Sequence, residues 1–392
     1  MRLSERTAWE LGENVLTRRL RERRDRGEQV FDLTVSNPTA CGFSYNRDAL
    51  LAPFASPAAM EYEPEPFGLE SARAAVAAYY RDHGAEVALR NICLTTSTSE
   101  AYSYLFRLLC DPGDEVLIAR PSYPLFDFIA RLDSVALREY HLHHDPGATV
   151  SSAHAWTIDF ASLREAITNR TRAIVLVHPN NPTGNYSSAA EHEQLEKLCA
   201  DHNIALIVDE VFLDYPVQAD ATPRTFAAAE GSALCFVLSG ISKVCALPQM
   251  KLSWIVARGP AAVLEPAVAR LEVVADTFLS VNAPTQAALP NWLGGRERIQ
   301  EQIRARVRSN LDVLDSRLRG SHADRTAVEG GWAAVLRVPR EVNGVPFAEA
   351  ALDRGVFVQP GEFYGLPAGR AVVSLLSLPE VWEHGLALLP IA

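Results

Sequence analysis

Short segments made mostly of apolar residues recur through the middle of the chain. Six of them have the length of β-strands: Glu115–Arg120, Val135–Tyr140, Ala173–His178, Ile204–Asp209, Leu234–Ser239 and Leu252–Ala257. Several are apolar at nearly every position, which is typical of a sheet covered on both faces. Helix-like segments lie between or beside them: Gly68–His83, Ser99–Cys110, Asp159–Thr168, Ser187–His202 and Pro260–Ala275. This alternation predicts an α/β fold with a mostly parallel sheet covered by helices.

The last third of the chain is organised differently. A helical stretch from about 285 to 318 precedes a strand at Trp332–Val338, a helix near Phe347–Arg354, a strand near Ala371–Leu376 and a last helix from Pro379. These elements predict a small α+β domain. Because 392 residues exceed what one simple core holds, we expect a large domain at residues 49–285. The small domain would combine residues 1–48 with residues 286–392.

Charge and composition limit the kinds of partner and the cellular location that we expect. The net charge of −11 argues against nucleic acid or an anionic membrane as the main partner. The first 24 residues are charged and lack the apolar core of a signal peptide, and no apolar run is long enough to cross a membrane. None of the six cysteines forms a Cys-x-x-Cys pair, so free thiols in a reducing compartment are expected. We predict a cytoplasmic protein.

Polar clusters stand at the carboxyl ends of five segments, where ligands bind in open α/β sheets. They are Thr95–Glu100, Pro121–Pro124, Asn180–Gly184, Asp209–Glu210 and Ser239–Lys243. Each cluster alone has an ordinary explanation: Ser99 suits a helix N-cap, the Asn-Pro-Thr-Gly sequence from Asn181 suits a turn, and Lys243 is one lysine after a strand. Their order and common position favour one shared site.

In this order and at these spacings, the clusters resemble the class I/II aminotransferases of PLP fold type I, which use pyridoxal 5′-phosphate (PLP). The resemblance runs from Asn37 to the C-terminal strand. The family pattern Ser-x-Ser-Lys, followed eight residues later by Arg, corresponds to Gly240-Ile241-Ser242-Lys243 followed by Lys251. The resemblance implies that Lys243 is the Schiff-base lysine, whose amine also serves as general base and acid.

Three further residues match family positions around the cofactor ring. Asp209 matches the aspartate that pairs with the pyridine nitrogen and keeps it protonated, which deepens the electron sink. Asn181 matches the donor to the phenolic oxygen, and Tyr123 matches the aromatic residue that stacks on the pyridine ring.

The resemblance also implies a phosphate site at a helix start, where free N–H groups suit an anion. The residues expected at this helix start are Ser97, Thr98 and Ser99. The further cofactor residues expected near Lys243 in the sequence are Ser239, Ser242 and Lys251. Tyr62 resembles the tyrosine that reaches the phosphate from the neighbouring subunit. A shared active site of this kind would require a homodimer.

Three positions depart from the family pattern. Lys251 replaces the usual phosphate-binding arginine and keeps its charge without its two-pronged shape. Phe212 stands where the family often has a tyrosine that donates to the phenolic oxygen. Ser374 stands where the best alignment places the arginine that clamps the substrate α-carboxylate, and serine cannot form a bidentate ionic pair. Another cation, neutral donors, or a substrate without an α-carboxylate at that position would each explain Ser374.

Two other residues are candidates for substrate contact. Arg370 lies four residues before Ser374 and would be a shifted substitute for the missing arginine, unless it lies on a solvated face. Asn37 lies where the N-terminal segment of the family closes over the substrate, although it also suits a turn.

The sequence therefore predicts an aminotransferase that moves an amino group between an amino-acid donor and a 2-oxo-acid acceptor through a Schiff base at Lys243. A PLP-dependent lyase, cyclase or oxidase on the same fold is the alternative. The Gly-x-Gly-x-x-Gly turn of a nicotinamide dehydrogenase and the Gly-x-Ser-x-Gly elbow of a serine hydrolase are missing from the sequence. His141, His143 and His144 lack the helical spacing of metal ligands, so no metal is expected.

Overall fold

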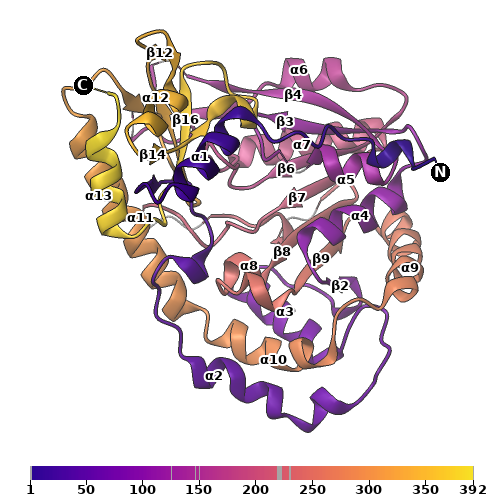
Figure 1. The fold of residues 1–392 in the computed structure, drawn as a ribbon. Coiled ribbons are helices and arrows are strands. Elements are labelled where there is room, and N and C mark those ends of the chain that lie inside the picture. Colours follow the sequence, from indigo (N-terminus) through magenta and orange to yellow (C-terminus); the bar gives the residue numbers. More distant parts are fainter. Residues whose placement is uncertain are drawn as a thin grey trace.

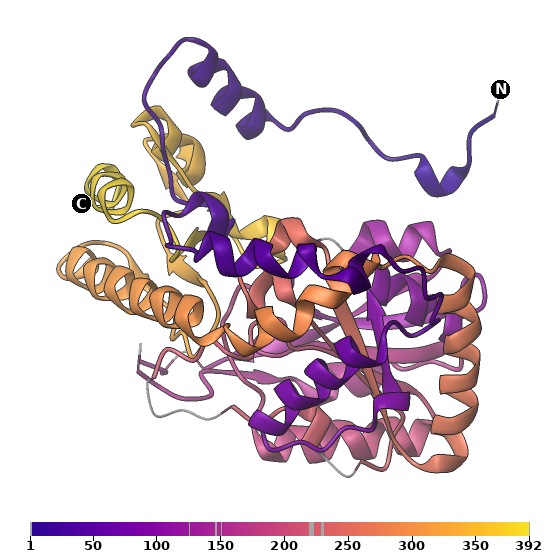
Figure 2. The ribbon, with the colours of Figure 1, turned by 90° about the horizontal axis from the view of Figure 1, so that it is seen from below.

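The computed structural model describes residues 2–124, 126–145, 147–149, 151–218, 223–228 and 231–391. A sheet flanked by helices forms the larger part, and both ends of the chain contribute to a smaller part beside it (Figures 1 and 2). Within the described ranges, no helix is both long and apolar enough to span a bilayer.

An eight-stranded sheet forms the centre of the larger part. Its strands are β2 (Ile92–Thr95), β3 (Glu115–Arg120), β4 (Ala136–His144), β5 (Trp156–Ile158), β6 (Thr171–Val177), β7 (Ala205–Asp209), β8 (Cys235–Gly240) and β9 (Ser253–Arg258). Their order across the sheet is β2-β9-β8-β7-β6-β3-β4-β5. The five middle strands, from β8 to β4, are parallel, whereas β9, β2 and β5 pair antiparallel. The predicted α/β fold with a mostly parallel sheet is confirmed.

Helices cover both faces of this sheet. Leu206 and its neighbour Ile207 point to opposite faces, and each lies in a separate apolar core. On the Leu206 side the helices are α3 (Glu70–Asp82), α6 (Phe160–Ala166), α7 (Ala189–His202), α8 (Ile241–Val244) and α10 (Ala283–Gly294). On the Ile207 side they are α4 (Thr98–Leu109), α5 (Phe126–Leu132) and α9 (Ala261–Phe278). Burial on both faces explains why the strands are apolar at nearly every position.

The smaller part has its own core around an antiparallel sheet of order β10-β11-β16-β15. Its strands are β10 (Asp324–Arg325), β11 (Ala333–Arg337), β15 (Gln359–Pro360) and β16 (Arg370–Ser374), with the hairpin β12 (Glu341–Val342) and β13 (Val345–Pro346). Its helices are α11 (Glu297–Leu318), α12 (Phe347–Asp353) and α13 (Pro379–Leu388). From the other end of the chain, α1 (Val15–Asp25) packs against it, and β1 (Phe31–Asp32) pairs with β14 (Val356–Phe357).

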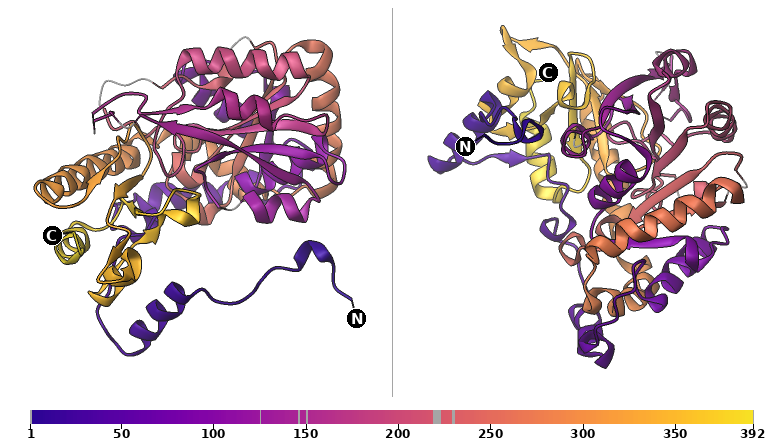
Figure 3. Two further views of the ribbon diagram at one scale, coloured as in Figure 1. Left: turned by 90° about the horizontal axis from the view of Figure 1, so that it is seen from above. Right: turned by 90° about the vertical axis from the view of Figure 1, so that its right-hand side faces the viewer.

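The residues before α1 form an extended arm that runs past the larger part (Figure 3). Arg6 donates to the carbonyl of Leu132 at 3.2 Å, and the ring of Trp9 packs edge-on against Phe128, with centroids 5.6 Å apart. The arm therefore contacts α5 of the larger part before the chain enters the smaller part.

The helical stretch expected from 285 to 318 is two helices, α10 and α11, with Gly294 and Gly295 at their junction. Helix α10 packs against α3, and its Trp292 donates to the carbonyl of Leu50 in α2 (Arg47–Leu51). Trp292 also lies in the core on one face of the large sheet. The domain boundary at 285 stays a prediction, and α10 packs on the larger part.

Two glycines join the parts next to the pocket described below. The N–H of Gly330 donates to the carbonyl of Gly184 at 2.8 Å. Gly184 has a φ of +73°, and a Cβ there would lie 2.7 Å from the Gly330 carbonyl oxygen. A side chain at Gly184 would therefore meet both backbone strain and a direct clash.

We expect Gly184→Ala to lower the free energy of unfolding by more than about 1 kcal/mol, because alanine disfavours positive φ and would push the two segments apart. Gly344→Ala is the matched control, since Gly344 has a φ of +79° with no atom within 4 Å of a Cβ. Urea unfolding of both variants separates the two causes. Equal losses would show that the contact with Gly330 adds nothing to backbone strain.

Candidate active site

The carboxyl ends of the parallel strands open into a pocket of about 380 Å³ between the larger and smaller parts. This volume lies in the usual range for small-molecule sites. Eight of the predicted site residues line the pocket: Thr98, Ser99, Tyr123, Asn181, Asp209, Ser242, Lys243 and Ser374. Trp332 and Tyr364 line it from the smaller part. The pocket therefore needs both parts of the molecule.

Lys243 lies in the short helix α8, directly after β8. The Tyr215 hydroxyl donates to the Lys243 carbonyl at 2.6 Å, and Gln300 Nε2 donates to the Val244 carbonyl at 2.8 Å, so the backbone of this turn is fixed. The Nζ atom lies 5.1 Å from the ring centroid of Trp332. Among the described residues, it forms no hydrogen bond or ion pair. Burial lowers the pKa of Lys243, and the charge of Asp209 partly opposes this shift.

Asp209 ends β7 with its carboxylate buried. The N–H of Val211 donates to Oδ1 and the hydroxyl of Tyr102 donates to Oδ2, each at 3.1 Å. Burial raises the pKa of Asp209 to about 6, whereas these two hydrogen bonds and Lys243 lower it. The carboxylate is thus oriented by neutral donors and lacks a cation in ion-pair contact within the described structure.

Tyr102 is a pocket residue that the sequence reasoning missed. It lies in the first turns of α4, four residues after Thr98, so the helical repeat places both side chains on one face. Its ring packs edge-on against Phe126, with centroids 5.1 Å apart. Its position four residues after Thr98 of the predicted phosphate site was the sequence signal that could have identified Tyr102 as a pocket residue.

Asn181 lies in the loop after β6, and Tyr123 in the loop after β3. The neighbouring Asn180 holds these loops together, because its Nδ2 donates to the Pro121 carbonyl at 3.1 Å and to Thr183 Oγ1 at 2.7 Å. The side chain of Asn181 makes no hydrogen bond to another described residue. Both Asn181 and Tyr123 line the pocket, so they are available to a ligand there.

Helix α4 begins at the same pocket. Ser97 is its N-cap, with Oγ accepting from the N–H of Glu100 at 3.1 Å, while the Glu100 carboxylate accepts from the N–H of Thr96 at 2.7 Å. This bond uses one acceptor site of the Ser97 hydroxyl, and the O–H remains able to donate. Thr98 and Ser99 follow in the first turn and line the pocket. Their free N–H groups and the positive helix end suit an anion.

Four predicted cofactor residues do not line the pocket: Ser97 at the N-cap of α4, and Ser239, Lys251 and Tyr62. Ser239 is fully buried in β8, and its hydroxyl has no hydrogen-bond partner within the described residues. Lys251 is exposed after the short helix η7 (Pro248–Met250), and Tyr62 is 82% exposed. Contact of these residues with a cofactor stays a prediction.

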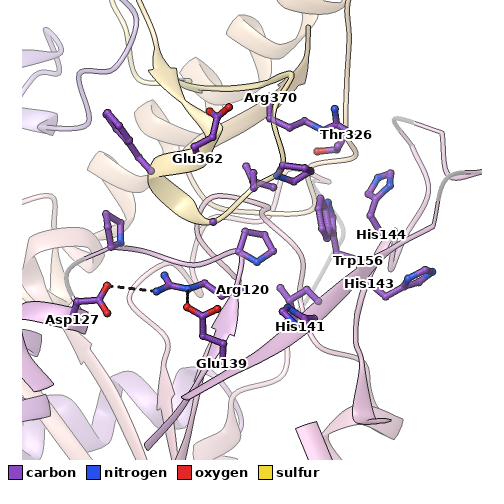
Figure 4. A pocket seen from close by; sticks show the side chains of 17 residues that line it. Arg120, Asp127, Glu139, His141, His143, His144, Trp156, Thr326, Glu362 and Arg370 are labelled. Atoms are coloured by element: carbon purple, nitrogen blue, oxygen red, sulfur yellow. Dashed lines mark hydrogen bonds and ion pairs between the residues drawn. The ribbon is translucent and has the colours of Figure 1, made fainter. Parts of the chain in front are cut away.

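The three substrate candidates lie in different places. Ser374 lines the pocket, is 3% exposed, and accepts from the Leu376 N–H through its hydroxyl at 3.3 Å. Asn37 caps the short helix η2 (Pro38–Ala40) and does not line the pocket, whereas the nearby Thr34 and Ser36 do. Arg370 lines a different cleft (Figure 4). Of the described residues that line the active-site pocket, Lys243 is the single cation, and none is an arginine.

Comparison with known proteins gives the family. Residues 55–381 match the family described as aminotransferase class I and II. A glutamate-pyruvate aminotransferase of Escherichia coli strain K12 is 29% identical over 281 residues, covering 71% of this chain and 67% of that protein. An alanine aminotransferase of Mycobacterium tuberculosis strain H37Rv is 28% identical over 376 residues, covering 92% of this chain and 84% of that protein.

Solved structures agree on the fold. An alanine aminotransferase from Pyrococcus furiosus superimposes with a TM-score of 0.87 at 22% identity, covering 99% of this chain and 98% of that chain. An aspartate aminotransferase from Thermus thermophilus, crystallised with maleate, gives a TM-score of 0.81 at 24% identity and covers 99% of both chains. The chain belongs to the class I and II aminotransferase family and is an aminotransferase with the type I fold.

The buried carboxylate generates a stability prediction for the cofactor-free protein. The unfolded chain ionises Asp209 near its usual pKa of 3.8, whereas the folded protein retains the proton up to about pH 6. Stability therefore falls as the pH rises through this window, and the full cost is present above it. We expect Asp209→Asn to raise the free energy of unfolding by roughly 2–3 kcal/mol at pH 7 and by little at pH 4.

Urea unfolding at the two pH values measures this difference. Asp312→Asn is the matched control, because Asp312 is an exposed carboxylate on α11, and it should change stability by less than about 0.5 kcal/mol. If Asp209→Asn destabilised the protein at pH 7 as much as at pH 4, burial would not be the dominant influence on this carboxyl group.

Proposed function

We propose that this aminotransferase uses pyridoxal 5′-phosphate attached to Lys243. The supporting observation is that one pocket holds a buried amine and a buried carboxylate that form no ion pair with each other. PLP suits both groups, since its aldehyde reacts with an amine and its pyridine nitrogen pairs with an aspartate. The start of α4 adds N–H groups for the phosphate. The residues present therefore fit this cofactor.

Lys243, Asp209 and Tyr102 would have different roles in the reaction. Bound PLP supplies an electron sink that lets a proton leave the α-carbon of an amino acid. Lys243 Nζ, once the substrate amine has displaced it from the cofactor, would take up that proton and return it at the neighbouring carbon. Burial lowers the pKa of this amine. Asp209 would keep a proton on the pyridine nitrogen, and the Tyr102 hydroxyl positions the Asp209 carboxylate.

Three more groups would hold the cofactor. Asn181 would donate to the phenolic oxygen, with Phe212 offering no hydroxyl for that purpose. Tyr123 would cover one face of the ring and exclude water from it. The first-turn N–H groups of Thr98 and Ser99 would hold the phosphate.

The proposed substrates are an amino-acid donor and a 2-oxo-acid acceptor, in keeping with the alanine and glutamate-pyruvate aminotransferases that resemble this chain. Their α-carboxylate would be held by neutral donors, because no described lining residue is an arginine. Thr34, Ser36 and Gln359 line the pocket and carry such donors. Gln359 accepts from the Tyr364 hydroxyl through Oε1, which leaves its amide N–H groups for a substrate.

We further propose a homodimer in the cytoplasm. Met60 and Tyr62 are 88% and 82% exposed, which is unusual for large side chains and favours a partner surface there. A partner subunit would receive Tyr62 at its phosphate site. The six cysteines are all free thiols, as expected in a reducing compartment.

Attachment of the cofactor can be tested directly, because the chain has three lysines, Lys197, Lys243 and Lys251. Borohydride reduction of the PLP-loaded protein should fix the cofactor to Lys243 alone, as read by peptide mass spectrometry. Lys243→Ala should no longer attach the cofactor, because the amine is the nucleophile. Its rate of transamination should fall by at least about a thousandfold, because the same amine is the base.

Lys197→Ala is the matched control, because Lys197 is exposed and, among the described residues, pairs with Asp201 alone, on its own helix. It should retain cofactor and activity. Modification of another lysine, or normal turnover by Lys243→Ala, would overturn the proposed role of Lys243.

A second function is favoured by Ser374 at the family's arginine position: a PLP-dependent lyase, cyclase or oxidase. Mixing the yellow protein with single amino acids separates the two. Transamination should move the visible absorption band to the near ultraviolet, and a 2-oxo acid should reverse the change. Release of ammonia without reversal would favour the second function.

A further inference from the structure

A second cleft, of about 680 Å³, lies between the β4–β5 edge of the large sheet and the smaller part. Figure 4 shows the side chains that line it. His144 ends β4 and Trp156 begins β5, whereas Thr326 and Arg370 belong to the smaller part. None of these four residues lines the active-site pocket.

One end of this cleft contains an arginine, Arg370, that makes no ion pair of its own within the described structure. Arg370 is partly buried and donates to the carbonyl of Gly369 at 3.0 Å. It forms no ion pair with any described carboxylate. Its guanidinium points toward Thr326 and away from Glu362 (Figure 4). Burial and the charge of Arg337 lower the pKa of Arg370, whereas the charge of Asp324, which pairs with Arg337, raises it. Arginine stays protonated in proteins despite this shift.

The same end gathers three buried polar atoms that have no hydrogen-bond partner in the described structure. They are Thr326 Oγ1, Trp156 Nε1 and His144 Nε2. Thr326 is 3% exposed and Trp156 is 6% exposed, and the His144 ring lies edge-on to Trp156 with centroids 4.6 Å apart. Unpaired buried polar atoms are rare because each loses its hydrogen bonds to water. Three of them beside one unpaired arginine indicate a site that a ligand completes.

The chemistry of these atoms selects the ligand. Trp156 Nε1 and the Arg370 guanidinium can only donate, and the Thr326 hydroxyl is free to donate. A guanidinium with neighbouring N–H and O–H donors matches the geometry of an oxyanion. At the other end of the cleft, Arg120 is already paired with Glu139 at 2.7 Å and Asp127 at 3.5 Å. Unpaired positive charge is thus confined to the Arg370 end.

We propose that the Arg370 end of this cleft binds the carboxylate or phosphate group of a small molecule. Arg370 supplies the charge, and Thr326 and Trp156 donate hydrogen bonds. His144 Nε2 donates a further hydrogen bond in the tautomer that carries its proton there. This site is separate from the pocket that contains Lys243.

The same two segments line both sites, so an anion bound at Arg370 should affect the positions of residues in the active-site pocket. Pro121 and Pro124 line the cleft on either side of Tyr123, and Phe363 lines it next to Tyr364. The N–H of Ser122 donates to the Tyr364 carbonyl at 2.9 Å, which joins the two segments. A ligand that moves either segment therefore moves a tyrosine of the active site.

The test is isothermal titration calorimetry of the cofactor-loaded protein with inorganic phosphate and, separately, with acetate. Loading fills the phosphate site at the start of α4, so that site does not compete. We expect saturable binding of at least one probe, weakened about tenfold or more by Arg370→Gln, since a charge-assisted pair is lost. Arg340→Gln is the matched control, because Arg340 is exposed next to Gly369 and does not line the cleft.

Thr326→Val keeps the shape of the buried side chain and removes one donor, so it should weaken binding severalfold if Arg370→Gln folds poorly. Phosphate binding alone would assign a phosphate ligand, and acetate binding alone a carboxylate. No saturable binding of either probe would overturn the site, as would equal affinities in wild type, Arg370→Gln and Thr326→Val. Failure of the protein to retain PLP would count against the proposed function and not against this cleft.

Discussion

The buried carboxyl group of Asp209 is the constraint on which the rest of the active site depends. It lies at the end of β7 without a cation in ion-pair contact among the described residues, and burial raises its pKa to about 6. Two neutral donors, the Val211 N–H and the Tyr102 hydroxyl, fix its direction and offset part of the cost of ionisation. A fold selected for stability alone would place a neutral side chain there. Under the proposed function, this carboxylate is one half of a contact that a pyridinium ring would complete.

The parallel sheet explains why the other groups meet at this carboxylate. Parallel strands end at one edge, so the loops after β3, β6 and β7 and the helix after β8 converge there. The smaller part closes the pocket with Trp332, whose ring packs against Tyr215, and Tyr215 in turn holds the Lys243 carbonyl. The position of Lys243 thus depends on packing between the two parts as well as on the sheet.

Much of this could be predicted from the sequence, and the exceptions have physical causes. Strand β3 begins and ends at the predicted residues, because a strand covered on both faces is marked by continuous apolarity. Strands β2 and β5 were not predicted, since four and three residues carry too little periodic signal. Tyr102 was missed because its hydrogen bond to Asp209 joins residues far apart in the chain. Such pairings exist only after the sheet has formed.

The position of Arg370 is another feature that the sequence alone could not predict. Arg370 and Ser374 are four residues apart on β16, so strand alternation alone would point both side chains to one face. The chain after β15 prevents them from sharing a pocket, because Gly361 crosses directly over Arg370. A Cβ on Gly361 would lie 2.6 Å from the Arg370 Cβ, and this close approach requires glycine. The segment from Gly361 to Tyr364 therefore separates two cavities on this face, with Tyr364 lining one and Arg370 the other. An arginine at position 370 therefore lines a different cavity from residue 374, and no arginine is among the described residues that line the active-site pocket.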